Sequence, residues 1–146
     1  MKKNLKHIYL SASIIMIFAA NIFAGEIAIQ ANQLPRKAQD FVKANFPNDP
    51  IVYAEQDRRS YKVELDSGIE VDFDKNGDWT DVSSKNSPLP TQFMPANILN
   101  TVQQKYAQTA ILEISKEYLS YKLKLANNRE VYVDNSGKIV GDKLDW

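Results

Sequence analysis

The sequence predicts an α+β fold built from two tandem repeats, each with one helix packed on a four-stranded antiparallel meander. The main observation is internal similarity, because a shift of 60 positions lays residues 34–81 over residues 94–141 without a gap. Eleven pairs are then identical: Pro35/Pro95, Val42/Val102, Ile51/Ile111, Ser60/Ser120, Tyr61/Tyr121, Lys62/Lys122, Leu65/Leu125, Glu70/Glu130, Val71/Val131, Asp74/Asp134 and Gly77/Gly137. They fall on apolar, turn and helix-start positions, which is typical of repeated structural units. Helical spacing at the start of each unit and strand alternation after it complete the prediction.

Residues 1–24 have the form of a secretory signal peptide. Lys2, Lys3 and Lys6 precede a stretch without charged residues, and small residues follow at its end. We expect cleavage after Ala24, because the apolar run is shorter than the roughly 20 residues of a spanning helix. The protein is therefore expected to be periplasmic or secreted.

Composition excludes several classes of function. Removing residues 1–24 takes away three of the 18 basic residues and none of the 18 acidic ones, which leaves a net charge of −3. Such a chain lacks the basic footprint of nucleic-acid binding and the basic amphipathic stretch of a membrane-surface helix. The only histidine is His7 and there is no cysteine, so the usual zinc ligands, Ser-His or Cys-His nucleophiles and disulfides are not expected.

A short segment, residues 25–33, precedes the first unit. Each unit then begins with an apolar residue and a proline, Leu34-Pro35 and Met94-Pro95, and proline suits the first turn of a helix. Apolar residues at helical spacing predict helices over residues 35–46 and 95–106. Pro47 and Pro50 end the first helix, whereas the second ends more softly at residues 107–109.

Four strands are expected after each helix. In the first unit they cover residues 51–56, 61–65, 69–73 and 78–82, and in the second residues 111–116, 121–125, 129–133 and 138–140. The second and third strands of each unit alternate apolar and charged residues, as strands with one buried face do. Turns with Gly77 and Gly137 form hairpins. The units cover residues 34–82 and 94–146, joined by a connector at residues 83–93.

The alternation also assigns side chains to faces. Tyr61, Val63, Leu65, Val71 and Phe73 are expected to point toward the helix, with Tyr121, Leu123, Leu125, Val131 and Val133. The opposite face is expected to carry Tyr53, Glu55, Lys62, Glu64, Glu70 and Asp72, then Glu113, Ser115, Lys122, Lys124, Glu130 and Tyr132. A slip of one residue would exchange the faces. The alternation does not assign Trp79.

The chain resembles the PepSY-like, β-lactamase-inhibitor-protein-like exported proteins. The resemblance rests on the doubled proline-helix-meander unit, the strand Tyr61-Lys-Val-Glu-Leu65 and the hairpin Asp74-Lys-Asn-Gly77-Asp-Trp79, and it covers residues 34–146. It implies helices on one side of a continuous, curved, open sheet, with the other side free to grip a protein. It implies no catalytic residue and no cofactor.

Three chemical interpretations compete with binding. The segment from Asp72 to Asp78 is similar to the start of a calcium loop, but position 12, a bidentate glutamate in such loops, is Ser83. A hairpin turn explains both copies better. Glu64, Glu70 and Asp72 are a possible carboxylate set for a hydrolase, but no apolar neighbours suggest a raised pKa. Ser60 beside Lys62, and Ser120 beside Lys122, are better explained as strand starts than as Ser-Lys dyads.

We therefore predict an exported, non-enzymatic protein whose open sheet face binds a protein or peptide, with an inhibitory or regulatory role. The residues expected to bind are Tyr53, Glu55, Lys62, Glu64, Glu70, Trp79, Lys122, Lys124, Glu130 and Tyr132. Tyrosine and tryptophan beside charges are typical of interface hot spots, although Trp79 and Trp146 could equally cap the core. A carboxylate-dependent envelope hydrolase and a calcium-dependent envelope module remain as alternatives.

Overall fold

The computed structural model describes residues 25–144, so the predicted signal peptide and Trp146 lie outside the described residues. A short 3-10 helix, η1 (Ala31–Gln33), precedes two α-helices, α1 (Arg36–Asn45) and α2 (Ala96–Lys105). The strands are β1 (Ile27–Ala28), β2 (Ile51–Gln56), β3 (Ser60–Leu65), β4 (Ile69–Asp74), β5 (Trp79–Ser84), β6 (Ile111–Lys116), β7 (Ser120–Leu125), β8 (Arg129–Asp134) and β9 (Ile139–Leu144). We call residues 34–84 the N-terminal half and residues 94–144 the C-terminal half.

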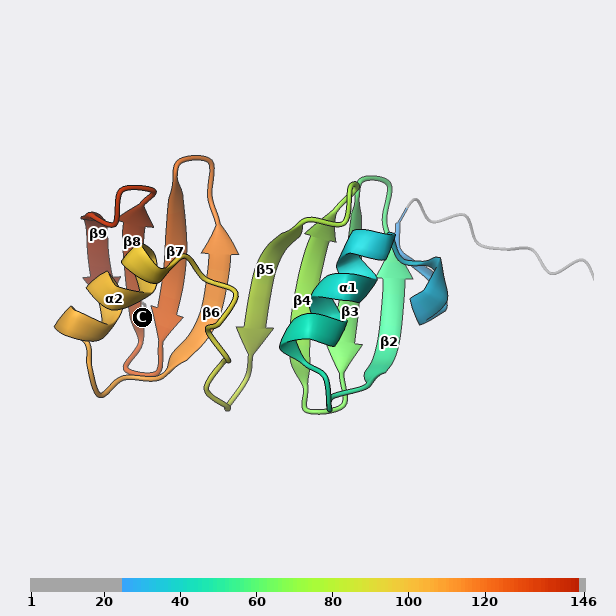
Figure 1. The fold of residues 1–146 in the computed structure, drawn as a ribbon, viewed down its shortest axis with the longest axis horizontal. Coiled ribbons are helices and arrows are strands. Elements are labelled where there is room, and N and C mark those ends of the chain that lie inside the picture. Colours follow the sequence, from blue (N-terminus) through green and yellow to red (C-terminus); the bar gives the residue numbers. More distant parts are fainter. Residues whose placement is uncertain (1–24, 145–146) are drawn as a thin grey trace, which may run out of the picture.

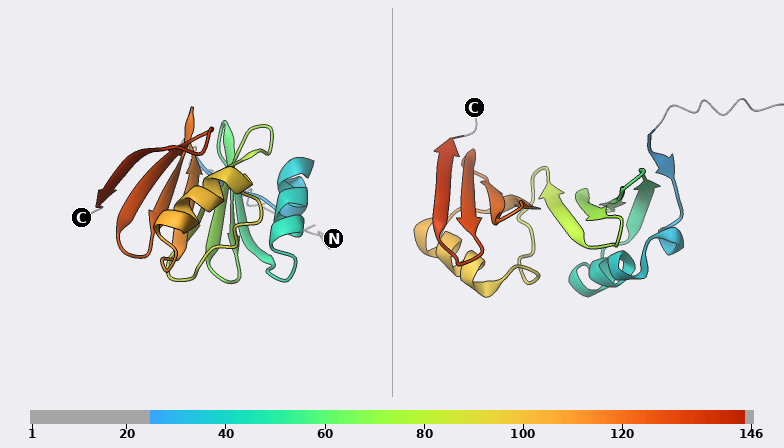
Figure 2. Two further views of the ribbon diagram at one scale, coloured as in Figure 1. Left: turned by 60° about the vertical axis from the view of Figure 1, so that its left-hand side comes forward. Right: turned by 90° about the horizontal axis from the view of Figure 1, so that it is seen from above.

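The nine strands form one antiparallel sheet in which every strand lies beside its sequence neighbour (Figure 1). Both helices cover the same side of this curved sheet, and no helix of residues 25–144 lies on the other side (Figure 2). The α+β class and the open antiparallel sheet are thereby confirmed. Equivalent helices and strands of the two halves begin 60 residues apart, as with Arg36 and Ala96 or Ile51 and Ile111.

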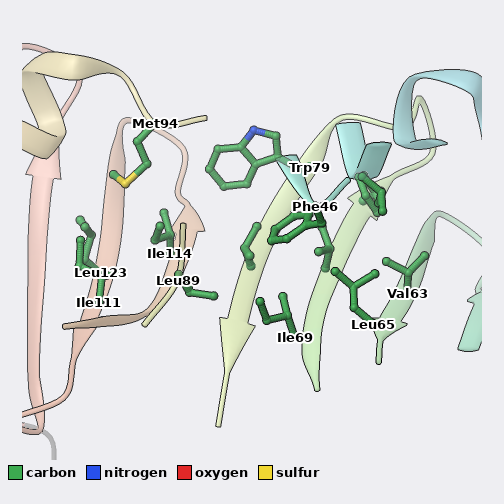
Figure 3. Close-up of a cluster of buried hydrophobic side chains, with 14 of the residues drawn as sticks. Phe46, Val63, Leu65, Ile69, Trp79, Leu89, Met94, Ile111, Ile114 and Leu123 are labelled. Carbon is green, nitrogen blue, oxygen red and sulfur yellow. The ribbon is translucent and has the colours of Figure 1, made fainter. Parts of the chain in front are cut away.

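The core lies between the helices and the sheet. Val63, Leu65, Val71 and Phe73 are at most 1% exposed, and so are Leu123, Leu125, Val131 and Val133. These are the residues that strand alternation assigned to the helix side, so the predicted register is confirmed. At the boundary between the halves, Leu89 and Met94 belong to the same buried apolar cluster as Ile114 and Trp79 (Figure 3).

Three strands differ from the sequence prediction. β1 was not expected, and it adds a two-residue strand beside β2 at one end of the sheet. β5 continues to Ser84 and β9 to Leu144, beyond the predicted ends at positions 82 and 140. Within residues 25–144, neither ten-residue helix is long and apolar enough to cross a membrane.

Candidate binding face

The helix-free side of the sheet presents two continuous rows of side chains. The first row contains Glu55, Lys62, Asp72, Asp81, Ser115, Lys122, Tyr132 and Gly141, each paired in register with the next. The second contains Tyr53, Glu64, Glu70, Ser83, Glu113, Lys124, Glu130 and Lys143. Paired residues of antiparallel strands share a face at about 5 Å separation. Both rows therefore run from β2 to β9, and we call them together the open face.

The open face brings together nine of the ten residues that the sequence predicted for binding. They are Tyr53, Glu55, Lys62, Glu64, Glu70, Lys122, Lys124, Glu130 and Tyr132. The sequence missed Asp81 and Lys143, which lie on β5 and β9. The register shifts between Asp72 and Phe73 where β4 pairs with β5, and between Tyr132 and Val133 where β8 pairs with β9. Simple alternation along β5 and β9 therefore did not place their side chains.

Trp79 was predicted to bind a partner together with the residues of the open face. This placement is wrong, because the Trp79 side chain lies on the helix side of the sheet. It pairs with Phe73 before the register shift and is 8% exposed. Its ring packs against Phe93 at a centroid distance of 5.1 Å, and the ammonium of Lys116 lies 3.9 Å from the ring centroid. Burial lowers the pKa of Lys116. Trp79 is therefore a core residue that joins α1 to the sheet.

Charge is distributed unevenly over the open face. The N-terminal half contributes five carboxylates and one cation: Glu55, Glu64, Glu70, Asp72, Asp81 and Lys62. The C-terminal half contributes two carboxylates and three cations: Glu113, Glu130, Lys122, Lys124 and Lys143. One end of the face therefore has a formal charge of −4 and the other of +1.

The ion pairs follow the same division. In the C-terminal half, Lys122 Nζ lies 2.7 Å from Glu113 Oε1, and Lys143 Nζ lies 2.9 Å from Glu130 Oε2. In the N-terminal half, Lys62 Nζ lies 4.0 Å from both Glu70 Oε2 and Asp72 Oδ1. Lys62 therefore forms only long ion pairs with these two carboxylates.

Two pairs of carboxylates lie directly opposite each other in the N-terminal half. The register places Glu64 opposite Glu70 and Asp72 opposite Asp81. Like charges at directly opposite positions destabilise a sheet. A cationic group lying over these pairs would relieve the repulsion.

Partial burial acts on the same carboxylates. Burial raises the pKa of Asp72, and the charge of Lys62 opposes the shift. Burial also raises the pKa of Asp81, although the hydroxyl of Ser115 donates a hydrogen bond to its carboxylate. A raised pKa of Asp72 was not expected from the sequence, because the residues that enclose Asp72 belong to neighbouring strands.

The tyrosines mark the two ends of the open face. The Tyr53 hydroxyl donates to Glu55 Oε2 at 2.8 Å, and the Tyr132 hydroxyl donates to Glu130 Oε2 at 3.2 Å. Tyr53 is 42% exposed, and its bond to Glu55 raises the pKa of its hydroxyl. The Tyr132 ring lies across Gly141, where an added Cβ would be 3.1 Å from the ring. Each end therefore presents an aromatic ring beside a carboxylate.

Two shallow hollows interrupt the face. One of about 330 Å³ is lined by Glu55, Lys62 and Asp72 with residues from the end of β2 and the start of β3. The other, of about 300 Å³, lies at the boundary between the halves and is lined by Glu70, Ser83, Glu113 and Lys124 with neighbouring residues. Each could receive a side chain from a molecule lying on the sheet.

The calcium-like segment forms a turn. Asp74 Oδ1 accepts hydrogen bonds from the backbone N–H groups of Asn76 and Asp78 at 2.8 and 3.0 Å. Asp134 accepts equivalent bonds from Ser136 and Lys138. Within residues 25–144, no three or more His, Cys, Asp or Glu side chains are grouped so that they could hold a metal ion. The carboxylates of Asp74 and Asp134 thus stabilise the two hairpin turns through backbone hydrogen bonds.

The family described as "Putative beta-lactamase-inhibitor-like, PepSY-like" matches residues 20–71 and 59–141. This chain belongs to that family. Among curated proteins, none matches it.

Three solved structures are similar over nearly their whole length. A "putative periplasmic protein from DUF2874 family" of Bacteroides vulgatus is 32% identical, with a TM-score of 0.75 over 81% of this chain and 96% of that one. A "putative calcium-regulated periplasmic protein" of Bacteroides thetaiotaomicron is 30% identical, with a TM-score of 0.76 over 81% and 96%. A "putative periplasmic protein of unknown function" of Bacteroides vulgatus is 27% identical, with a TM-score of 0.75 over 82% and 99%.

Proposed function

We propose that the protein is an exported, non-enzymatic binding protein whose open face takes a protein or peptide partner. The observation that carries this proposal is the pair of side-chain rows running from β2 to β9 on the side that no helix covers. Such a surface can supply the roughly 800 Å² per partner of a standard interface. The inhibitor-like family description agrees with a binding role.

The charge distribution indicates the chemistry of the partner. A segment with lysine or arginine side chains would lie over the N-terminal half, where Glu64 faces Glu70 and Asp72 faces Asp81. Charge complementarity of this kind sets orientation and speeds association more than it adds affinity. Tyr53 and Tyr132 would supply aromatic contacts at the two ends.

The proposed compartment is the cell envelope. The similar structures described above are called periplasmic, and residues 1–24 have the form of a signal peptide. Each half is proposed to be one repeat of a helix and a four-stranded meander, α1 with β2–β5 and α2 with β6–β9.

A pull-down from cell envelope tests the proposal. Mature protein would be compared with a Tyr53→Ala/Tyr132→Ala variant, and with an Arg36→Ala/Lys43→Ala variant that alters exposed residues of α1 on the other side of the sheet. A discrete partner should be retained by mature protein and the α1 variant and lost by the tyrosine variant. Equal capture by all three would contradict binding through the open face.

A calcium-dependent module is the second candidate, because the similar Bacteroides thetaiotaomicron structure is described as calcium-regulated. Calcium should then raise the Tm of the protein, and Asp74→Ala should abolish the increase. An unchanged Tm in the presence of calcium would remove this candidate.

A further inference from the structure

The two halves differ at positions that the 60-residue shift makes equivalent. Phe46, Ile69 and Val82 of the N-terminal half are 6%, 7% and 0% exposed. Their equivalents in the C-terminal half are Tyr106, Arg129 and Asp142. An apolar cluster in one half is thus replaced by polar and charged residues in the other.

The neighbours of the N-terminal cluster explain why it is apolar. The C-terminal half covers it, since Val82 on β5 pairs with Ile114 on β6 and both are fully buried. The backbone N–H of Leu89 donates to the carbonyl of Ile111 at 2.9 Å, which fastens the segment before α2 over this boundary. Leu89 and Met94 complete the apolar packing (Figure 3).

At the other end of the sheet, β9 lies at the edge and, among residues 25–144, has β8 as its only neighbouring strand. There the carboxylate of Asp142 accepts hydrogen bonds from three side chains. Lys105 Nζ lies 2.8 Å away, and the Tyr106 hydroxyl and the Arg129 guanidinium complete the set. Lys105 and Arg129 also lie within 5.2 and 5.9 Å of the centroid of the Tyr106 ring.

This arrangement fastens the end of α2 to β8 and β9 through polar side chains, while Val140 and Leu144 of β9 are 57% and 43% exposed. Lys105 and Tyr106 come from the C-terminal end of α2, Arg129 from β8 and Asp142 from β9. The bonds from Lys105 and its companions hold the pKa of Asp142 well below its usual range. The Asp142 side chain is only 21% exposed, so the charge is fixed at the sheet edge.

We propose that Lys105, Tyr106, Arg129 and Asp142 form an end cap that terminates the sheet and prevents β9 from pairing with a second copy of the chain. Terminal units of repeat proteins need a polar outer surface, because no further unit covers them. An uncapped, unpaired edge strand is a template for pairing with another chain. β9 is the counterpart of β5, which does pair with a following strand, and the polar side chains at this end differ from the apolar ones at the equivalent positions beside β5.

Transplanting the residues of the N-terminal half tests this proposal. The variant Lys105→Asn/Tyr106→Phe/Arg129→Ile/Asp142→Val gives the C-terminal half the cluster that normally receives a neighbour. Sedimentation velocity should show a monomer for the original protein and concentration-dependent dimers or larger species for the variant. An Arg36→Ala/Asp40→Ala variant, which removes an exposed ion pair on α1, should stay monomeric.

A folded cap variant that remains monomeric at all concentrations would overturn the proposal, as would equal self-association of the α1 control. Asp142→Asn provides a second test if the fourfold variant does not fold, because it removes the charge at constant size. Its β9 amides should exchange hydrogen severalfold faster than those of the original protein, with unchanged exchange in β3 and β4. Unchanged exchange in β9 would contradict the proposed cap.

Discussion

At the scale of single residues, Asp72 and Asp81 combine two unfavourable features on the open face. They lie opposite each other in register, and partial burial raises the pKa of both. Residues that reduce stability while lying on an uncovered surface are typical of functional sites. Their cost to the folded state is therefore consistent with a role in binding a cationic partner.

Asp81→Asn should stabilise the protein at neutral pH. The raised pKa of Asp81 means that the folded protein holds this proton more tightly than the unfolded chain, so stability falls as pH rises above the ordinary carboxyl pKa of about 3.9. We expect the variant to have a Tm a few degrees higher at pH 7, with the difference disappearing in acid. Thermal unfolding across pH measures this.

Asp66→Asn serves as the control, because Asp66 is an exposed turn residue. It should leave the Tm nearly unchanged. A lower Tm for Asp81→Asn at pH 7 would show that the hydrogen bond from Ser115 outweighs burial at this carboxylate.

At the scale of helices and strands, the sequence predicted well where alternation is regular. β3, β4, β7 and β8 follow their predicted spans closely, because apolar residues recur at every second position along most of each strand. The sequence did not predict β1, because two exposed residues show no periodicity. It also did not predict on which side Trp79 lies, because a register shift places that residue on the helix side. Helix α1 ends at Asn45 and α2 ends at the equivalent residue, Lys105, although only α1 is followed by a proline. Pro47 therefore does not determine where α1 ends.

The two glycine turns of the N-terminal half offer a matched test of helix–hairpin contact. Gly68 and Gly77 both have positive φ, +82° and +83°. A Cβ at Gly68 would meet nothing within 4 Å, whereas one at Gly77 would lie 2.8 Å from Pro35 Cβ at the start of α1. The hairpin after β4 therefore packs directly against the helix.

Gly68→Ala should cost about 1–2 kcal/mol of stability, the penalty of a left-handed conformation. Gly77→Ala should cost clearly more, because the new methyl group also displaces α1. Urea unfolding of the two variants makes the comparison. Equal losses would show that the helix moves aside freely.

At the scale of the whole molecule, the sequence predicted the α+β class, the open sheet and most of the residues that lie on the open face. The residues predicted for the face already carry formal charges of −3 in the N-terminal half and 0 in the C-terminal half, and β5 and β9 increase this difference with one residue each, which the sequence did not place. Asp81 and Lys143 were placed only by the register of their neighbours. The sequence also did not predict the end cap, because Arg129 and Asp142 lie on different strands and come into contact only in the folded sheet.

Site-specific crosslinking in the cell envelope tests most directly whether the open face binds a partner. A photo-crosslinking residue would replace Glu64 on the open face or, as the matched control, Arg36 on the exposed side of α1. Binding through the open face predicts a discrete adduct from position 64 that disappears with Tyr53→Ala/Tyr132→Ala, and none from position 36. The same adduct from both positions, or an adduct from position 36 alone, would contradict this binding.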